Sequence, residues 1–389
     1  MRRALAGILG FLSTVFGMLV VLPRINDAMW RIQLVFNEFS GVGVLLGTLA
    51  ILLRRSGFGF VLGLLGAGLS AVPFSRFRRA QRDMDGMMAE ALGADYEQHI
   101  PAVARQRMTN ARWWVPHLLT TRENDFPAEV RFDVPYLETP SRILNLDVYR
   151  PTIPPAHGNQ YPAVIAIHGG SWRTGDKGNY FIPHYRYLAS QGYYVFDVQY
   201  RLTERDNVGW PVPLEDIRSA IRWVKSRAAI YNLDPERIAL LGRSAGGHLA
   251  LQAAYRATGG CADTRVRSVI AIYAPTNLRL SGWEPSPAVQ SLLGGRIYEM
   301  PERYGEASPI DHAEPGVPPT MLIHGYMDYL VSPIHAEMVL NRLRVAQVPC
   351  VVLRVPWARH GFDAFRPGLG AQLTQYYLDR FLAWSLTSA

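Results

Sequence analysis

A series of short apolar segments begins near residue 130 and is interrupted by glycine-rich turns and helical segments. Residues 161–167 are continuously apolar, which is typical of a strand buried on both faces. We expect strands at 130–136, 143–148, 161–167, 193–198, 237–241, 268–273, 320–324 and 350–355, and helices at 213–229, 248–257 and 335–346. This alternation predicts an α/β fold, with a mostly parallel sheet and helices on both faces.

Three uncharged apolar runs occupy the first 74 residues. They span residues 4–22, 39–53 and 57–74, and arginines stand beside each of them. A helix needs about 20 residues to cross the apolar core of a bilayer. The 15-residue run at 39–53 reaches that length only by extending back to Leu34, which would bury Asn37 and Glu38 near one end. We therefore predict a membrane region at 1–74 with two or three transmembrane helices, and we prefer three.

The topology of this membrane region stays open. A cleavable signal peptide is the alternative for the first run, but its apolar core would have only about 7–15 residues, and no small-residue cleavage site follows Leu22. With three spans, one side carries Arg2, Arg3, Arg54 and Arg55, and the other carries Arg24, Arg31, Arg76, Arg78, Arg79 and Arg82. The larger count places the second side, with the large domain, in the cytoplasm. A free N-terminal amine and the dominance of the first span argue for the opposite orientation.

Residues 75–129 are predicted to form an amphipathic helix and a connector to the domain at 130–389. Apolar side chains recur there at helical spacing, at Met84, Met87, Met88, Leu92 and Tyr96. The pair Trp113-Trp114 suits either the lipid headgroup level or a buried position. Within the apolar runs, the pairs Gly43–Gly47 and Gly59–Gly63 have the spacing of close helix packing, although general glycine enrichment explains it equally well.

Composition excludes several classes of protein. The net charge is +8, but all except two of the 40 basic residues are arginines, and they are scattered. Half of the positive excess lies beside the apolar runs of the first 74 residues, which indicates membrane segments and predicts no binding of nucleic acid. A chain with 49% hydrophobic residues is not disordered. Two cysteines, Cys261 and Cys350, exclude a disulfide scaffold and a cysteine-rich zinc module.

A Gly-x-Ser-x-Gly motif stands where one expected strand passes into a helix, at Gly242-Arg243-Ser244-Ala245-Gly246. A serine on such a sharp turn exposes its hydroxyl at the carboxyl end of the sheet, and the turn needs glycines because larger side chains would clash. The amide of Ala245 lies at the helix N-terminus, where partial positive charge favours an oxyanion. The alternative is a serine that only caps a helix after a glycine turn.

Other expected strands are followed by groups that complement Ser244. The segment His168-Gly169-Gly170 lets Gly169 and Gly170 direct amides at an oxyanion, together with Ala245. Asp328 and His360 follow the last two strands, so the chain order is Ser244, Asp328, His360, as in triads built on such a sheet. His360 would accept the proton of Ser244, and Asp328 would fix the imidazole tautomer.

Other charged and histidine residues near these motifs are alternatives for the site. Asp363 is too close to His360 in sequence to reach the far side of its ring easily, and Asp311-His312 is expected in a loop. His248, one helical turn after Ser244, is expected to pack. His324 and Asp328 have the spacing of metal ligands, but the glycine between them breaks a helix, so we predict no metal site.

Together these motifs resemble the α/β-hydrolase fold, and most closely its esterase and lipase branch with a His-Gly-Gly oxyanion motif, related to the hormone-sensitive-lipase and feruloyl-esterase-like groups. The matching segments are 168–172, 200–202, 234–238, 242–250, 324–328 and 360–362. The resemblance extends from about residue 130 to the C-terminus and implies a serine esterase that forms an acyl-enzyme and uses no cofactor. The chain is also similar to prenylcysteine methylesterases, which join such a domain to N-terminal membrane segments.

We therefore expect a multi-pass, membrane-anchored serine carboxylesterase acting on small or lipophilic esters, with membrane lipid as a partner. The alternatives are amide cleavage by the same triad, as in formamidases and acyl-peptidases, and a non-catalytic membrane interaction module, against which the intact triad argues. The insert at 275–315 is too short for a full lid and predicts an open, shallow site. Trp172 and Trp283 suit either its acyl pocket or the core. Motifs do not encode acyl or alcohol specificity, and the oligomeric state is not predicted.

Overall fold

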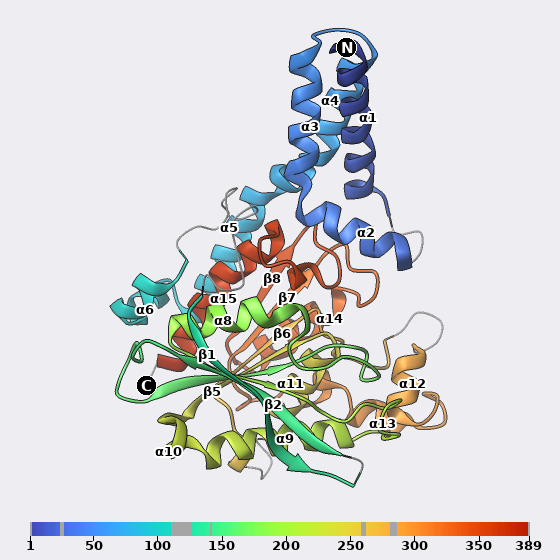
Figure 1. The fold of residues 1–389 in the computed structure, drawn as a ribbon. Helices are drawn as coiled ribbons and strands as arrows, with labels where there is room; N and C mark the ends of the chain where they lie inside the picture. The colour runs from blue at the N-terminus through green and yellow to red at the C-terminus, as the bar shows by residue number, and fades with distance from the viewer. Residues whose placement is uncertain are drawn as a thin grey trace.

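The computed structural model describes residues 2–23, 27–109, 126–140, 142–257, 262–280 and 286–387. The predictions for Trp113, Trp114 and Trp283, and the positions of Arg24 and Cys261, lie outside these residues. Two parts are visible in Figure 1: a large domain built on a sheet, and a bundle of helices that projects from it and holds the N-terminus at its far end.

A single eight-stranded sheet forms the centre of the large domain, in the order β1-β2-β4-β3-β5-β6-β7-β8. The strands are β1 (Ala128–Glu138), β2 (Ile143–Pro151), β3 (Tyr161–Ile167), β4 (Tyr194–Val198), β5 (Leu233–Arg243), β6 (Ser268–Ile272), β7 (Thr320–Gly325) and β8 (Cys350–Val355). Strand β2 is antiparallel to both of its neighbours, and all other pairs are parallel. The predicted α/β fold with a mostly parallel sheet is confirmed.

The apolar runs of the sequence account for the buried centre of this sheet. Every residue of β4, β6 and β7 is buried, because helices cover both faces of the parallel strands. Each expected strand is present. The largest difference is at β5, which begins at Leu233 rather than residue 237, because Leu233 pairs with Tyr161 across an irregular register.

The helices of the large domain lie on the two faces of the sheet and around its carboxyl edge. They are α8 (Ile182–Gln191), α9 (Val212–Ser226), α10 (Ala228–Tyr231), α11 (Ala245–Tyr255), α12 (Pro287–Leu293), α13 (Pro301–Glu306), α14 (Ile334–Val345) and α15 (Leu369–Thr387). Figure 1 shows α8 and α15 above the sheet and α9 and α10 below it. Short 3₁₀ segments lie at Tyr96–His99, Asn179–Phe181, Ala262–Thr264, Pro309–His312 and Phe362–Ala364.

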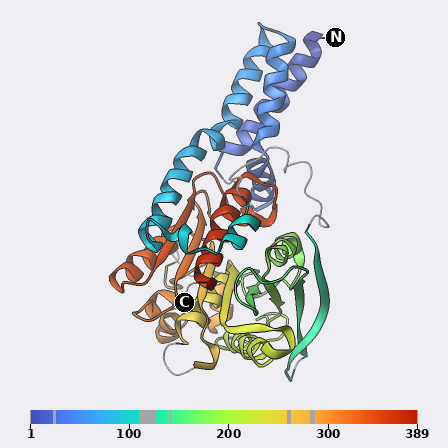
Figure 2. The ribbon, with the colours of Figure 1, turned by 90° about the vertical axis from the view of Figure 1, so that its left-hand side faces the viewer.

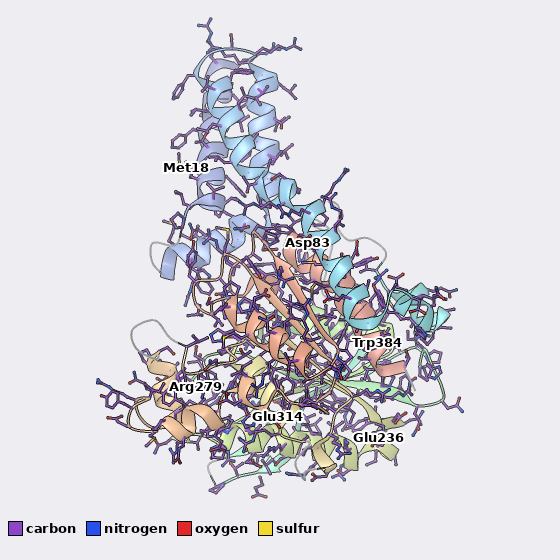
Figure 3. All side chains as sticks on the ribbon, turned by 180° about the vertical axis from the view of Figure 1, so that it is seen from behind. Met18, Asp83, Glu236, Arg279, Glu314 and Trp384 are labelled. Atoms are coloured by element: carbon purple, nitrogen blue, oxygen red, sulfur yellow. The ribbon has the colours of Figure 1, made fainter. Side chains whose placement is uncertain are left out.

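The N-terminal bundle consists of α1 (Arg2–Val21), α3 (Ser40–Leu53) and α4 (Phe58–Ser70). Among the described residues, two helices are long and apolar enough to cross a membrane: Arg2–Val21 and Phe58–Leu92. The bent pair Met29–Glu38 and Ser40–Leu53 gives a third if it is counted as one span. Large apolar side chains are exposed along the bundle, and Figure 3 shows one of them, Met18, on its outer side.

The second apolar run departs from the prediction. The chain bends by 71° between α2 (Asp27–Glu38) and α3, so the run at 39–53 is not extended straight back through Leu34. Helix α3 alone has 14 residues, about 21 Å. Glu38 is buried against the large domain, where its Oε2 accepts the Gly370 N–H at 2.7 Å. The bend therefore places the Glu38 carboxyl group at the N-terminal end of α15, where it accepts one of the N–H groups that have no partner within the helix.

Glycines allow the bundle helices to approach one another closely. A Cβ at Gly10 would lie 2.7 Å from the Gly59 carbonyl oxygen, and one at Gly63 would lie 2.8 Å from the Gly47 carbonyl oxygen. Distances this short exclude any larger residue without movement of the backbone. The small-residue spacing therefore has a packing role in this bundle.

Helix α5 (Val72–Leu92) joins the bundle to the large domain. Figure 2 shows it continuing from α4 and running along the side of the domain. Its methionines Met84, Met87 and Met88 are buried, and it packs against β8 at the edge of the sheet. The predicted amphipathic helix thus packs on the domain, and the boundary that we drew between residues 74 and 75 falls inside α5. A further short helix, α6 (Ala102–Arg107), follows.

Candidate active site

Ser244 occupies a strained turn between β5 and α11. Its φ and ψ angles are 53° and −121°, a conformation that few residues other than glycine adopt. A Cβ at Gly242 would overlap the Gly246 carbonyl, and a Cβ at Gly246 would overlap the Ile167 carbonyl. Because both flanking positions lack room for a side chain, the Gly-x-Ser-x-Gly spacing is a steric requirement of this turn.

His360 lies between Ser244 and Asp328, each of which follows the carboxyl end of a different strand. Its Nε2 is 3.0 Å from the Ser244 Oγ, and its Nδ1 is 2.7 Å from the Asp328 Oδ2. With the proton on Nδ1, the imidazole donates to the carboxylate and leaves Nε2 free to accept from the serine hydroxyl. The three residues predicted as a triad are therefore brought together in hydrogen-bonding order.

Asp328 is held as a carboxylate. Its Oδ1 accepts the N–H groups of Leu330 and Val331, both at 2.9 Å, and His324 approaches its Oδ2 at 3.4 Å. Burial alone would raise the pKa of this carboxyl, but the adjacent His360 and His324 lower it well below its ordinary value. Asp328 therefore stays ionised and can stabilise a positive charge on His360.

The glycines predicted for an oxyanion site lie beside the nucleophile. A Cβ at Gly169 would lie 2.9 Å from the Arg243 carbonyl oxygen and 3.2 Å from the Ser244 Cβ. Gly170 has a φ of +127°, and a Cβ there would overlap the Thr174 carbonyl. The structure thus brings Gly169 against the turn of Ser244 and Ala245, with Gly170 next to it in the chain.

Trp172 and His248 support the wall of this site. The Trp172 indole donates to the His248 Nδ1 at 3.2 Å, and the His248 Nε2 donates to the Ala307 carbonyl at 2.7 Å. Burial lowers the pKa of His248 to about 4, so the ring is neutral and can accept from the indole. His248 packs in the core beneath the turn that carries Ser244, and Trp172 lines the pocket.

A buried ion pair, which sequence reasoning missed, joins the serine turn to the histidine loop. Arg243 precedes Ser244, and its Nε is 2.6 Å from the Asp363 Oδ2. Tyr273 donates its hydroxyl to the other oxygen of Asp363 at 2.6 Å, and its ring centroid lies 4.5 Å from that of His360. Burial opposes ionisation of Asp363, but Arg243 keeps the pKa of the carboxyl below its ordinary value. The signal in the sequence was the position of the two charged residues, Arg243 directly before Ser244 and Asp363 three residues after His360.

A pocket of about 630 Å³ opens over Ser244 and Ala245. Its remaining wall consists of residues 171–172, 275, 277–280, 286, 288–289, 329–332 and 334–335. The insert between β6 and β7 and the loop after β7 therefore form most of the pocket. This volume is typical of a site for a small molecule.

The fold and this arrangement define the class of the protein: an α/β-hydrolase with the triad geometry of serine hydrolases. More specifically, the chain belongs to the BD-FAE family, whose model matches residues 146–343, half of the chain. The predicted resemblance to the esterase branch of this fold is confirmed.

Two curated relatives from Mycobacterium tuberculosis are similar to the chain. It is 32% identical to the probable carboxylic ester hydrolase LipM, over 57% of this chain and 54% of LipM. It is 27% identical to the esterase LipQ, over 74% of this chain and 70% of LipQ. The chain thus spans about half the length of LipM. Among solved structures, the thermophilic esterase Est2 of Thermogutta terrifontis is 27% identical, with a TM-score of 0.55, over 66% of this chain and 92% of that one.

Proposed function

We propose that this protein is a membrane-anchored serine carboxylesterase that acts through an acyl-enzyme on Ser244. The observation that supports this most directly is the position of His360, within hydrogen-bonding distance of both Ser244 and Asp328. The similarity to proteins named as ester hydrolases supports the choice of an ester as the substrate.

In the proposed mechanism, the Ser244 Oγ attacks the ester carbonyl while His360 takes its proton. The amides of Gly169, Gly170 and Ala245 stabilise the oxyanion, each contributing about 10²–10³ in rate. His360 then protonates the leaving alcohol, which departs. Water, activated by the same histidine, hydrolyses the acyl-enzyme and restores Ser244. No step requires a cofactor.

Hydrolysis of p-nitrophenyl esters from acetate to palmitate, by the detergent-solubilised wild type and by Ser244→Ala, tests this proposal. Est2 has been solved with propionate and with butyrate bound, so short acyl groups are suitable first substrates. We expect loss of several orders of magnitude in kcat in the variant. Full activity in Ser244→Ala would contradict the assignment of the nucleophile, and cleavage of anilides but not esters would indicate an amidase.

Paraoxon provides an independent second arm, because it phosphorylates Est2. We expect it to inactivate the wild type by transferring one diethylphosphoryl group, with release of p-nitrophenol, and mass spectrometry would locate this group on Ser244. A modified residue elsewhere would contradict the proposed role of this serine even if the variant were inactive for another reason.

We further propose that the bundle crosses a membrane and that the large domain is cytoplasmic. The bundle places Arg2, Arg3 and the Arg54-Arg55 pair at the far end, while a larger number of arginines lies at the end near the domain, at Arg31, Arg76, Arg78, Arg79 and Arg82. Ser56→Cys should then react with an impermeant maleimide on intact cells, with the wild type as the control. If Ser56→Cys were labelled only after the cells were permeabilised, the large domain would lie on the opposite side of the membrane.

A further inference from the structure

The loop that holds His360 contacts the end of the first apolar helix. Helix α1 has 20 residues, about 30 Å, which matches the apolar core of a bilayer. Leu22 follows its last residue, and the Leu22 carbonyl accepts a hydrogen bond from Arg359, the neighbour of His360, at 2.8 Å. Helix α2 lies across the top of the large domain at this junction (Figure 1), where Leu34 approaches Gly361. His360 is therefore the chain neighbour of a residue that contacts the expected boundary of the apolar layer.

The opening of the pocket carries four large, exposed apolar side chains. The side chains of Leu280, Tyr329, Leu330 and Ile334 all line the pocket and are between 42% and 57% exposed. Single exposed apolar residues are ordinary on a protein surface, but several around one opening mark a binding surface. We call these four residues the apolar rim.

The buried side chain of Arg359 links the apolar rim to the end of α1. The Arg359 guanidinium lies 5.9 Å from the centroid of the Tyr329 ring and bonds on its other side to Leu22. Leu22 is itself exposed, as are Ile32 and Val35 on α2. Exposed apolar side chains therefore lie on both sides of Arg359, at the end of α1 and on α2 on one side and at the apolar rim on the other.

We infer that the substrate is an ester dissolved in the bilayer, whose hydrocarbon part lies on the apolar rim while its carbonyl carbon reaches Ser244. This inference rests on the proposed esterase function and narrows its substrate class. The source of the substrate is the lipid bilayer, because the position of the rim near the apolar N-terminal helices would give no advantage to an ester taken from water.

The test uses the full chain reconstituted in phosphatidylcholine vesicles. The two substrates are p-nitrophenyl butyrate in solution and p-nitrophenyl palmitate dissolved in the same vesicles. The readout is the ratio of kcat/KM for palmitate to that for butyrate. Leu330→Asp should lower this ratio about tenfold or more, because it removes apolar contact with the long chain. Leu280→Asp, on the insert, should lower it as well, whereas Leu330→Met should keep it.

Ile230→Asp is the matched control, since Ile230 is an equally apolar, exposed residue on α10, far from the rim. It should leave both rates unchanged. An unchanged ratio in both rim variants, or a wild type that cleaves butyrate but not the embedded palmitate, overturns the inference while leaving the esterase proposal intact. A wild type that cleaves neither ester in a Ser244-dependent way overturns the proposed function, and the inference with it.

Discussion

The guanidinium group of Arg359 donates a hydrogen bond to the carbonyl oxygen of Leu22, across 337 residues of chain. Arg359 precedes His360, and its side chain is fully buried, with burial lowering its pKa. The contact therefore ties the end of α1 to the loop that holds the proposed catalytic base. Among the described residues, its Nε and Nη1 have no hydrogen-bond partner.

Arg359→Met is expected to change the free energy of unfolding by no more than about 1 kcal/mol. The substitution removes a buried charge that has one acceptor, and replacing such a charge by an apolar side chain of similar length is often neutral or stabilising. Urea unfolding in detergent, followed by tryptophan fluorescence, measures the effect. A loss of several kcal/mol would show that the bond to Leu22 is essential to the junction.

Arg243→Met is expected to have the opposite outcome, although Arg243 is also a buried arginine beside a triad residue. Its removal leaves the Asp363 carboxylate buried without its counter-charge, which costs about 3–5 kcal/mol. The free energy of unfolding and kcat should both fall. Tyr273→Phe, which removes only one hydrogen bond to Asp363, should cost about 1 kcal/mol and serves as the milder comparison.

Asp328→Asn should lower kcat about 10³–10⁴-fold with little effect on folding. The asparagine oxygen can still accept from Leu330 and Val331, but its amide would face the His360 Nδ1 and favour the wrong tautomer. Ester hydrolysis and far-UV circular dichroism measure the two effects. Activity within tenfold of the wild type would exclude Asp328 as the orienting carboxylate.

Gly246→Ala should abolish activity and reduce the yield of folded protein, because the new methyl group would overlap the Ile167 carbonyl. Gly86→Ala is the matched control. Gly86 lies within α5, where a Cβ meets no atom within 4 Å, so the substitution should stabilise the helix by about 1 kcal/mol. Comparable melting temperatures for the two variants would contradict the proposed steric role of Gly246.

Asp197 should make stability fall as the pH rises. This carboxyl group on β4 is fully buried, and burial raises its pKa to about 8 from an ordinary value of 3.8. Between these values the folded protein keeps a proton that the unfolded chain releases, so the free energy of unfolding decreases from about pH 4 to pH 8. Asp197→Asn should remove this component and be the more stable protein at pH 8. If the free energy of unfolding varied with pH in the same way in the wild type and in Asp197→Asn, the raised pKa of Asp197 would be contradicted.

The strands and the triad were predictable because both depend on local sequence. Buried parallel strands require continuous apolar runs, and the carboxyl ends of parallel strands meet at one edge of the sheet. Ser244, Asp328 and His360 each follow such a strand, so their meeting followed from the order of the motifs. The ion pair between Arg243 and Asp363 could not be predicted from the sequence, because it joins residues 120 positions apart and depends on the packing between two loops.

Short-range sequence patterns were sufficient to predict the α/β class, the residues of the candidate site and the apolar N-terminal helices, because each depends on residues close together in the chain. The way in which the bundle and the large domain meet is visible only in the three-dimensional structure. The bond from Gly370 to Glu38 at the start of α15 and the bond from Arg359 to Leu22 both join residues more than 300 positions apart in the chain. No local periodicity encodes such contacts, because they form only when the bundle and the sheet pack against each other.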